Sequence, residues 1–89
     1  MSLEKNIELA KLFDVYGELL SKNQYDIMDD FLNNDLTLSE VAENRQISRQ
    51  AVKDVVSKVE KKLQSYEEKL KFCEKINELE RKIKKLEEN

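Results

Sequence analysis

The chain has 89 residues, enough for one small domain, and carries a net charge of −3, with 39% of its residues charged. It contains no histidine, no proline and a single cysteine, which excludes a disulfide framework and histidine-based catalytic or zinc sites. No apolar run suits a signal peptide or a membrane span, so we expect a cytoplasmic, all-α protein with no membrane partner.

The first part of the chain predicts two helices. Apolar residues recur in steps of three and four over residues 2–20, and Gly17 falls near the end of this stretch, where it suits a close helix crossing or a local bend. Ser21 and Gln24 form a capping box that starts the second helix, and residues 33–35 are turn formers that end it. The expected buried face of the second helix consists of Tyr25, Met28, Phe31 and Leu32.

Residues 37–59 predict a helix-turn-helix motif. Thr37 and Glu40 form a second capping box, and Ser48 offers a further N-cap eleven residues later. The reversal between the two helices lacks the glycine that such turns commonly use. Asn44 is the residue that we expect to take the left-handed backbone conformation there.

The second helix of this motif has an apolar side and a polar side. We expect the apolar side to lock it across the first helix through Ile47, Val52 and Val55. The polar side is then free for a ligand, and its arginine and glutamine suit guanine and adenine edges in a major groove. The residues expected to face bases are Arg49, Gln50, Lys53 and Ser57. Those expected to hold phosphates are Ser48, Lys58 and Lys61.

Positive charge is concentrated on this motif. Residues 1–44 carry 3 basic and 10 acidic side chains, whereas residues 45–89 carry 13 and 9. Residues 45–62 alone carry 6 basic and 2 acidic side chains, which is the charge distribution expected of a surface that binds nucleic acid. A solvated, lysine-rich helix face would give the same counts, so both interpretations stay open.

Nothing in the sequence stops the second motif helix before the end of the chain, and such a helix would be about 60 Å long. Two apolar series follow one another along it and lose register between Cys73 and Ile76, where the helix kinks or its apolar stripe changes partner. In the second series isoleucine precedes leucine by three residues, as in a parallel two-stranded coiled coil. We therefore predict a helix-turn-helix domain over residues 1–65 and a helical extension over residues 66–89 that forms a homodimer. The alternative is that the extension folds back onto the first two helices.

No residue pattern points to catalysis, a metal or a cofactor. Cys73 lies on an apolar stripe without a histidine partner, which favours a packed thiol over a nucleophile. The acidic cluster of the second helix fits a solvated face better than a carboxylate site, and the six aromatic residues sit at core-like spacing. We expect no cofactor, no metal ion and no enzymatic activity.

Several segments resemble the YlxM-type proteins of Gram-positive bacteria and mollicutes. They are residues 12–20 (LFDVYGELL), 35–38 (DLTL), 47–52 (ISRQAV) and 65–70 (SYEEKL), in order and over nearly the whole chain. The resemblance implies a helix-turn-helix related to region 4 of bacterial sigma factors. It also implies a regulatory part in the signal recognition particle pathway, because members are typically encoded beside components of that particle. The chain departs from the family pattern at Arg45, Gln46 and Lys53.

Two functions follow from this sequence. In the first, the protein is a regulator that binds double-stranded DNA. In the second, it is a protein- or RNA-interaction module of the signal recognition particle pathway, without sequence-specific DNA binding. The acidic first half of the chain and its long terminal helix favour the second function, whereas the basic charge on the exposed motif helix favours the first. A helix-turn-helix fold alone does not decide between them.

Overall fold

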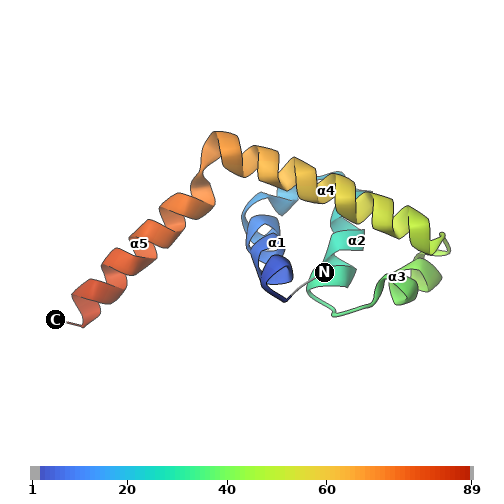
Figure 1. Ribbon diagram of the computed structural model, residues 1–89, viewed down its shortest axis with the longest axis horizontal. Helices are drawn as coiled ribbons and strands as arrows, with labels where there is room; N and C mark the ends of the chain where they lie inside the picture. Colours follow the sequence, from blue (N-terminus) through green and yellow to red (C-terminus); the bar gives the residue numbers. More distant parts are fainter. Residues whose placement is uncertain (1–2, 89) are drawn as a thin grey trace.

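The computed structural model describes residues 3–88, with side chains from residue 6 onward, and every regular element in that range is helical. The elements are α1 (Leu3–Tyr16), the 3-10 helix η1 (Gly17–Leu19), α2 (Lys22–Leu32), α3 (Leu38–Arg45), α4 (Arg49–Leu70) and α5 (Phe72–Glu87). In Figure 1, α4 crosses over α1, α2 and α3, while α5 leaves the far end of α4 and projects away from the other helices. The predicted all-α class is confirmed.

The core lies beneath α4. The inner side of this helix carries Val52, Val56, Val59 and Leu63, all of which are buried. They pack with the buried side chains of the preceding elements, which are Leu9, Leu12, Phe13, Tyr16, Leu20, Ile27, Met28, Val41 and Ala42. Burial of each large apolar side chain contributes about 1.5–3 kcal/mol, so this one cluster holds the small domain together.

The start of α2 follows the prediction, but part of its buried face does not. The Ser21 hydroxyl accepts the Gln24 amide N–H at 3.2 Å and the Gln24 side chain accepts the Ser21 N–H at 3.4 Å, which completes the capping box. Tyr25 is 37% exposed, whereas Ile27, which the pattern did not single out, is 1% exposed. Tyr25 stays partly exposed because it lies at the edge of the core, where its ring packs against that of Phe13 with ring centroids 4.9 Å apart.

Gly17 lies where α1 gives way to η1, and it permits a close approach there. A Cβ atom at this position would lie 3.2 Å from ring carbons of both Phe13 and Tyr25. The predicted roles, a close helix crossing and a local bend, are therefore both seen. At the start of α1 the predicted apolar face is incomplete, because Ile7 is 48% exposed.

The helix that begins at Arg49 does not continue to the end of the chain. It breaks at Lys71, which has left-handed backbone angles of φ 57° and ψ 29°. The break lies two residues before Cys73, where the apolar series lose register. The helix is therefore interrupted, but upstream of the predicted interval, because α5 is continuous from Cys73 to Ile76.

Side chains from α1 and α4 replace a conventional N-cap at the start of α5. We call this region the α4–α5 corner, and it consists of Tyr16, Glu67 and residues 71–74. Lys71 offers no side-chain cap to α5, and the Glu67 carboxylate accepts the N–H groups of Cys73 at 3.0 Å and Glu74 at 3.1 Å instead. The Tyr16 hydroxyl donates to Glu67 Oε1 at 2.6 Å and accepts the Phe72 N–H at 3.1 Å. A negative charge at a helix N-terminus also complements the helix dipole, so the direction of α5 is fixed from α1 and α4.

Candidate nucleic-acid interface

The first helix of the predicted motif is held by local hydrogen bonds at both ends. The Thr37 hydroxyl accepts the Glu40 N–H at 3.1 Å, and the Glu40 carboxylate accepts the Thr37 N–H at 3.0 Å, which together form the predicted capping box. These hydrogen bonds hold the pKa of the Glu40 carboxyl below its ordinary value. Because Glu40 is ionised at neutral pH, the cap of α3 is fully formed there.

The turn of the motif is a Schellman motif closed by Gln46. Its N–H donates to the carbonyl oxygen of Glu43 at 3.3 Å, and the next N–H, of Ile47, donates to that of Ala42 at 3.1 Å. Gln46 has φ 56° and ψ 43°, so the left-handed residue is Gln46, and the prediction of Asn44 is wrong. Asn44 lies inside α3, which ends at Arg45.

Arg45, one of the departures from the family pattern, anchors this turn to α2. Its Nη2 and Nε atoms both donate to Asp30 Oδ2, at 2.7 and 3.0 Å, and Nη2 also approaches the Asp26 carbonyl oxygen at 3.4 Å. The Arg45 guanidinium is therefore occupied within the domain. Its positive charge belongs to the α2–α3 contact and is not directed along the outer face of α4.

The second motif helix, α4, presents one buried side and one exposed side. Ser48 caps it, because its hydroxyl accepts the Ala51 N–H at 3.0 Å. Val52 is fully buried as predicted, but Val55 is only partly buried and Ile47 is 39% exposed. Val56 and Val59, which also face the core, complete the attachment that the prediction had assigned to these two residues.

All seven residues predicted to contact nucleic acid are exposed, and they lie along one side of this helix and its cap. At 100° per residue, five of the six that belong to α4 point away from Val52 and Val59, and Arg49 lies at the edge of that side. We define the outer face of α4 as this set, Ser48, Arg49, Gln50, Lys53, Ser57, Lys58 and Lys61. The helix-turn-helix geometry therefore brings them together on a surface that no other described part of the chain covers.

Sequence reasoning missed Asp54, which is also exposed and lies beside the residues of the outer face. Gln50 Nε2 donates to Asp54 Oδ1 at 2.9 Å, so the carboxylate orients the glutamine amide. The signal was present as a Gln–Asp pair four residues apart on one helix, a spacing that places the two side chains in contact. Lys62, by contrast, turns away from this face towards Gln24 Oε1, at 3.5 Å.

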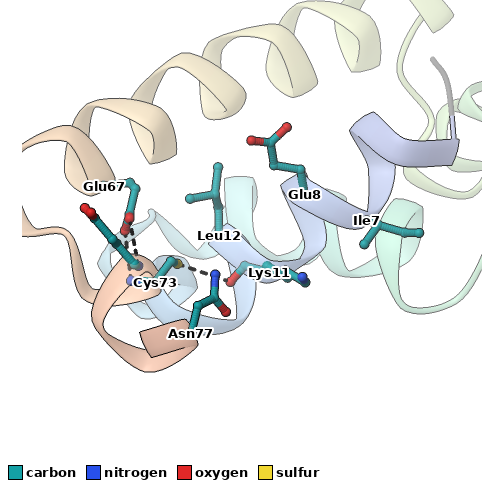
Figure 2. A pocket seen from close by; sticks show the side chains of 8 residues that line it. Ile7, Glu8, Lys11, Leu12, Glu67, Cys73 and Asn77 are labelled. Atoms are coloured by element: carbon teal, nitrogen blue, oxygen red, sulfur yellow. Dashed lines mark hydrogen bonds between the residues drawn. The ribbon is translucent and has the colours of Figure 1, made fainter. Parts of the chain in front are cut away.

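A separate hollow of about 480 Å³ lies between α1 and α5 (Figure 2), away from the outer face of α4. Cys73 lines it, and its thiol lies 3.9 Å from the Lys11 carbonyl oxygen. Burial, together with the nearby Glu67 carboxylate, raises the pKa of the Cys73 thiol to about 11. A thiol that is protonated at neutral pH is a poor nucleophile, so Cys73 does not supply this hollow with an activated nucleophile.

The capped helices, the tight turn and the exposed second helix together define a helix-turn-helix protein. The sequence matches, over residues 3–89, the family described as "UPF0122: Putative helix-turn-helix protein, YlxM / p13 like", and the chain belongs to that family. Within residues 3–88, no helix combines the length and apolar character that a membrane crossing requires.

Similar proteins occur in several bacteria. The chain is 41% identical to the UPF0122 protein YlxM of Bacillus subtilis over 88 residues, which is 99% of this chain and 80% of that protein. It is 37% identical to a UPF0122 protein of Fusobacterium nucleatum over 89 residues, or 100% of this chain and 86% of that protein. A UPF0122 protein of Clostridium perfringens strain SM101 is 41% identical over 75 residues, which is 84% of this chain and 67% of that protein.

Proposed function

We propose that this protein is a DNA-binding regulator of the cytoplasm that inserts the outer face of α4 into the major groove of a duplex. The observation that carries the proposal is the two-sided character of α4. Val52 and Val59 are fully buried on one side, whereas the basic and polar residues on the other side are all exposed. A recognition helix needs this combination, since it must be fixed to its domain and yet free to enter a groove.

The first turn of α4 carries the side chains that would read bases. Arg49 is suited to the O6 and N7 atoms of guanine, and Gln50 to the N6 and N7 atoms of adenine. The hydrogen bond to Asp54 uses one of the two amide hydrogens of Gln50, so its second N–H and its carbonyl oxygen remain available for a bidentate contact. Lys53 and Ser57 follow on the same face, one and two turns along.

Phosphate contacts would come from the edges of the same helix. The Ser48 hydroxyl oxygen caps α4 by accepting an N–H, and its own hydrogen remains free to be donated to a phosphate oxygen. Lys58 and Lys61 are exposed further along α4. Such contacts fix the position of the protein and supply affinity that falls with salt.

The test of this proposal is binding of the full-length chain to a randomised duplex pool at low salt, with selection and sequencing of bound DNA. Arg49→Ala should weaken binding to the selected site by about tenfold or more and relax its sequence preference. Lys58→Ala should weaken all duplexes to a similar extent and reduce the salt dependence. The control, Arg81→Ala, removes the same charge from α5 and should bind as the wild type does. Absence of binding to any duplex at low salt would overturn the proposal.

A second candidate function is a protein- or RNA-interaction module of the signal recognition particle pathway. The acidic first half of the chain and the exposed apolar side chains of α5 favour it, because neither feature is needed to contact a duplex. Capture experiments with the particle's protein and its RNA, each against the full-length chain, test it directly. Recovery of neither component would remove this candidate.

We also propose that the protein works as a homodimer joined through α5, its C-terminal helix. Two helix-turn-helix units held together would present two copies of α4 to successive half-sites on one duplex. The apolar residues that α5 exposes to solvent support this arrangement. Sedimentation of the full-length chain at increasing concentration, without DNA, measures its oligomeric state.

A further inference from the structure

The most exposed apolar surface of the molecule is a stripe along α5. Its members follow one another in steps of four, three, four and three residues, and each is between 41% and 74% exposed. The α5 stripe consists of Phe72, Ile76, Leu79, Ile83 and Leu86. Five large apolar side chains aligned on one helix and left in water mark a surface that another molecule covers.

The chain's own α1 meets the start of this stripe, where the Phe72 ring stacks on that of Tyr16 with ring centroids 6.2 Å apart, but every member of the stripe is still at least 41% exposed. Ile76 also lines a hollow with residues of α1, together with the neighbouring side of α5, which carries Cys73, Asn77 and Glu80. Figure 2 shows Cys73 and Asn77 beside Lys11, and Figure 1 shows the rest of α5 leading away from the domain. The α4–α5 corner fixes this direction, so the stripe leads away from the domain after Ile76.

We propose that the α5 stripe is the seam of a parallel two-stranded coiled coil formed with a second copy of this chain, and we assign its register. This inference rests on the homodimer of the proposed function and adds the orientation and the residues that select it. In heptad positions, Ile76 and Ile83 occupy a, and Leu79 and Leu86 occupy d. Isoleucine at a with leucine at d is the packing that favours two parallel strands.

The charges beside the seam select the same orientation. The g positions are Lys75 and Lys82, and the e positions after them are Glu80 and Glu87. In a parallel pair each g residue lies next to the e residue five positions later on the partner helix. Lys75 would therefore face Glu80 of the second copy, and Lys82 would face its Glu87. Because the dimer is symmetric, each pair occurs twice.

The opposite orientation brings like charges together. In an antiparallel pair, g residues face g residues and e residues face e residues, so lysine would meet lysine and glutamate would meet glutamate. The four side chains at the e and g positions are all exposed in the single chain. Lys75 lies 3.8 Å from Glu78 of the same helix, a loose surface pair that can be exchanged. A second copy in parallel is thus the partner whose charges fit.

The experiment measures the dimer dissociation constant of the full-length chain by sedimentation equilibrium, without DNA. Lys75→Glu with Lys82→Glu should weaken the dimer roughly thirtyfold or more, because four attractive pairs become repulsive. Adding Glu80→Lys and Glu87→Lys should restore it. The matched control, Arg81→Glu with Lys85→Glu, makes the same change in net charge at positions outside the seam and should leave the dimer intact.

Mixing the wild type with the fourfold variant tests the orientation. In a parallel coil the two chains should form separate homodimers, whereas in an antiparallel coil they would prefer to mix. Each of three results would overturn the assignment. The wild type could be monomeric, the double variant Lys75→Glu with Lys82→Glu could dimerise as tightly as the wild type, or the two chains could prefer to mix. DNA binding is measured separately, so loss of the coil and loss of duplex binding are distinguishable. Circular dichroism confirms that each variant keeps its helices.

Discussion

The Tyr16 hydroxyl donates a 2.6 Å hydrogen bond to Glu67, across 51 positions of sequence, and this pair decides where the long helix ends. Both side chains also bind the first N–H groups of α5, with Tyr16 accepting from Phe72 and Glu67 from Cys73. The corner replaces about 60 Å of straight helix with two segments that point in different directions. The orientation of α5 relative to the helix-turn-helix thus depends on a few polar contacts in a partly buried setting.

Tyr16→Phe should destabilise the protein by about 1–3 kcal/mol. The variant keeps the buried ring but leaves the Phe72 N–H and the Glu67 carboxylate each without one partner. Urea unfolding gives the change in the free energy of unfolding, and Tyr25→Phe on the exposed rim is the control, with an expected change below about 0.5 kcal/mol. A double-mutant cycle with Glu67→Gln should show coupling between the two positions. Additive effects would mean that the pair does not act as a unit.

The contribution of Glu67 to stability should disappear in acid. Desolvation raises the pKa of its carboxyl, but the hydrogen bonds from Tyr16, Cys73 and Glu74 outweigh this effect and bring the pKa below its ordinary value of 4.5. The unfolded chain therefore takes up the proton first, and stability is lost as the pH falls from about 4.5 through the lower pKa of the folded state.

The measurement is the free energy of unfolding of the wild type and of Glu67→Gln between pH 7 and pH 3. The difference between the two proteins should be largest at neutral pH and should shrink below pH 4.5, because the variant has no carboxyl to titrate there. Amide exchange of Cys73 and Glu74 reports the same event locally. A difference that stays constant over this range would contradict the assigned role.

The parts of the fold that could be predicted are those encoded by neighbours in sequence. Three N-caps, at Ser21, Thr37 and Ser48, depend on residues three positions away and were found where expected. The end of α4 depends on Tyr16, which lies far away in the sequence, and Lys71 is not a residue that signals left-handed backbone. No local pattern could have located that break.

The same reasoning applies to the candidate interface. The sequence predicted which residues of α4 are exposed, because the apolar period of the helix fixes the opposite side. It did not predict that Arg45 is held by Asp30, since the two residues are brought together only when α2 and α3 pack. Whether the exposed residues bind DNA is a question of partners, which the period of a helix does not answer.

Gln46→Gly should stabilise the protein by about 0.5–1 kcal/mol. Gln46 adopts left-handed backbone angles, which cost a residue with a Cβ atom roughly 1–2 kcal/mol. Glycine removes this strain, but part of the gain is offset because glycine has more conformational freedom in the unfolded chain. Its two Schellman hydrogen bonds involve backbone atoms only and should persist. Thermal unfolding should show a higher midpoint, and Asn44→Gly, inside α3, should show a lower one. A lower midpoint for Gln46→Gly would contradict the strain argument.

Cys73 should be slow to alkylate in the folded protein. Its thiol pKa of about 11 keeps it protonated at pH 8, where the thiolate is the reactive form. Iodoacetamide labelling followed by mass spectrometry should therefore be much slower in buffer than in urea. Glu67→Gln should speed labelling of the folded chain, because the negative charge beside the thiol contributes to the raised pKa. Equal rates with and without urea would contradict this prediction.

Asp54→Asn should strengthen duplex binding if the outer face of α4 is the DNA contact. The change removes an exposed acidic side chain that lies beside the residues of that face, and with it the repulsion of nearby phosphates, while the asparagine oxygen can still accept the Gln50 hydrogen bond. At low salt we expect affinity to rise by about three- to tenfold, and the gain should shrink as salt screens the charge. Fluorescence anisotropy with the selected duplex measures it, and Asp14→Asn, an exposed aspartate of α1, is the control for the same change in net charge. Equal gains for both variants would indicate that only total charge matters, and no gain for Asp54→Asn would place the duplex elsewhere.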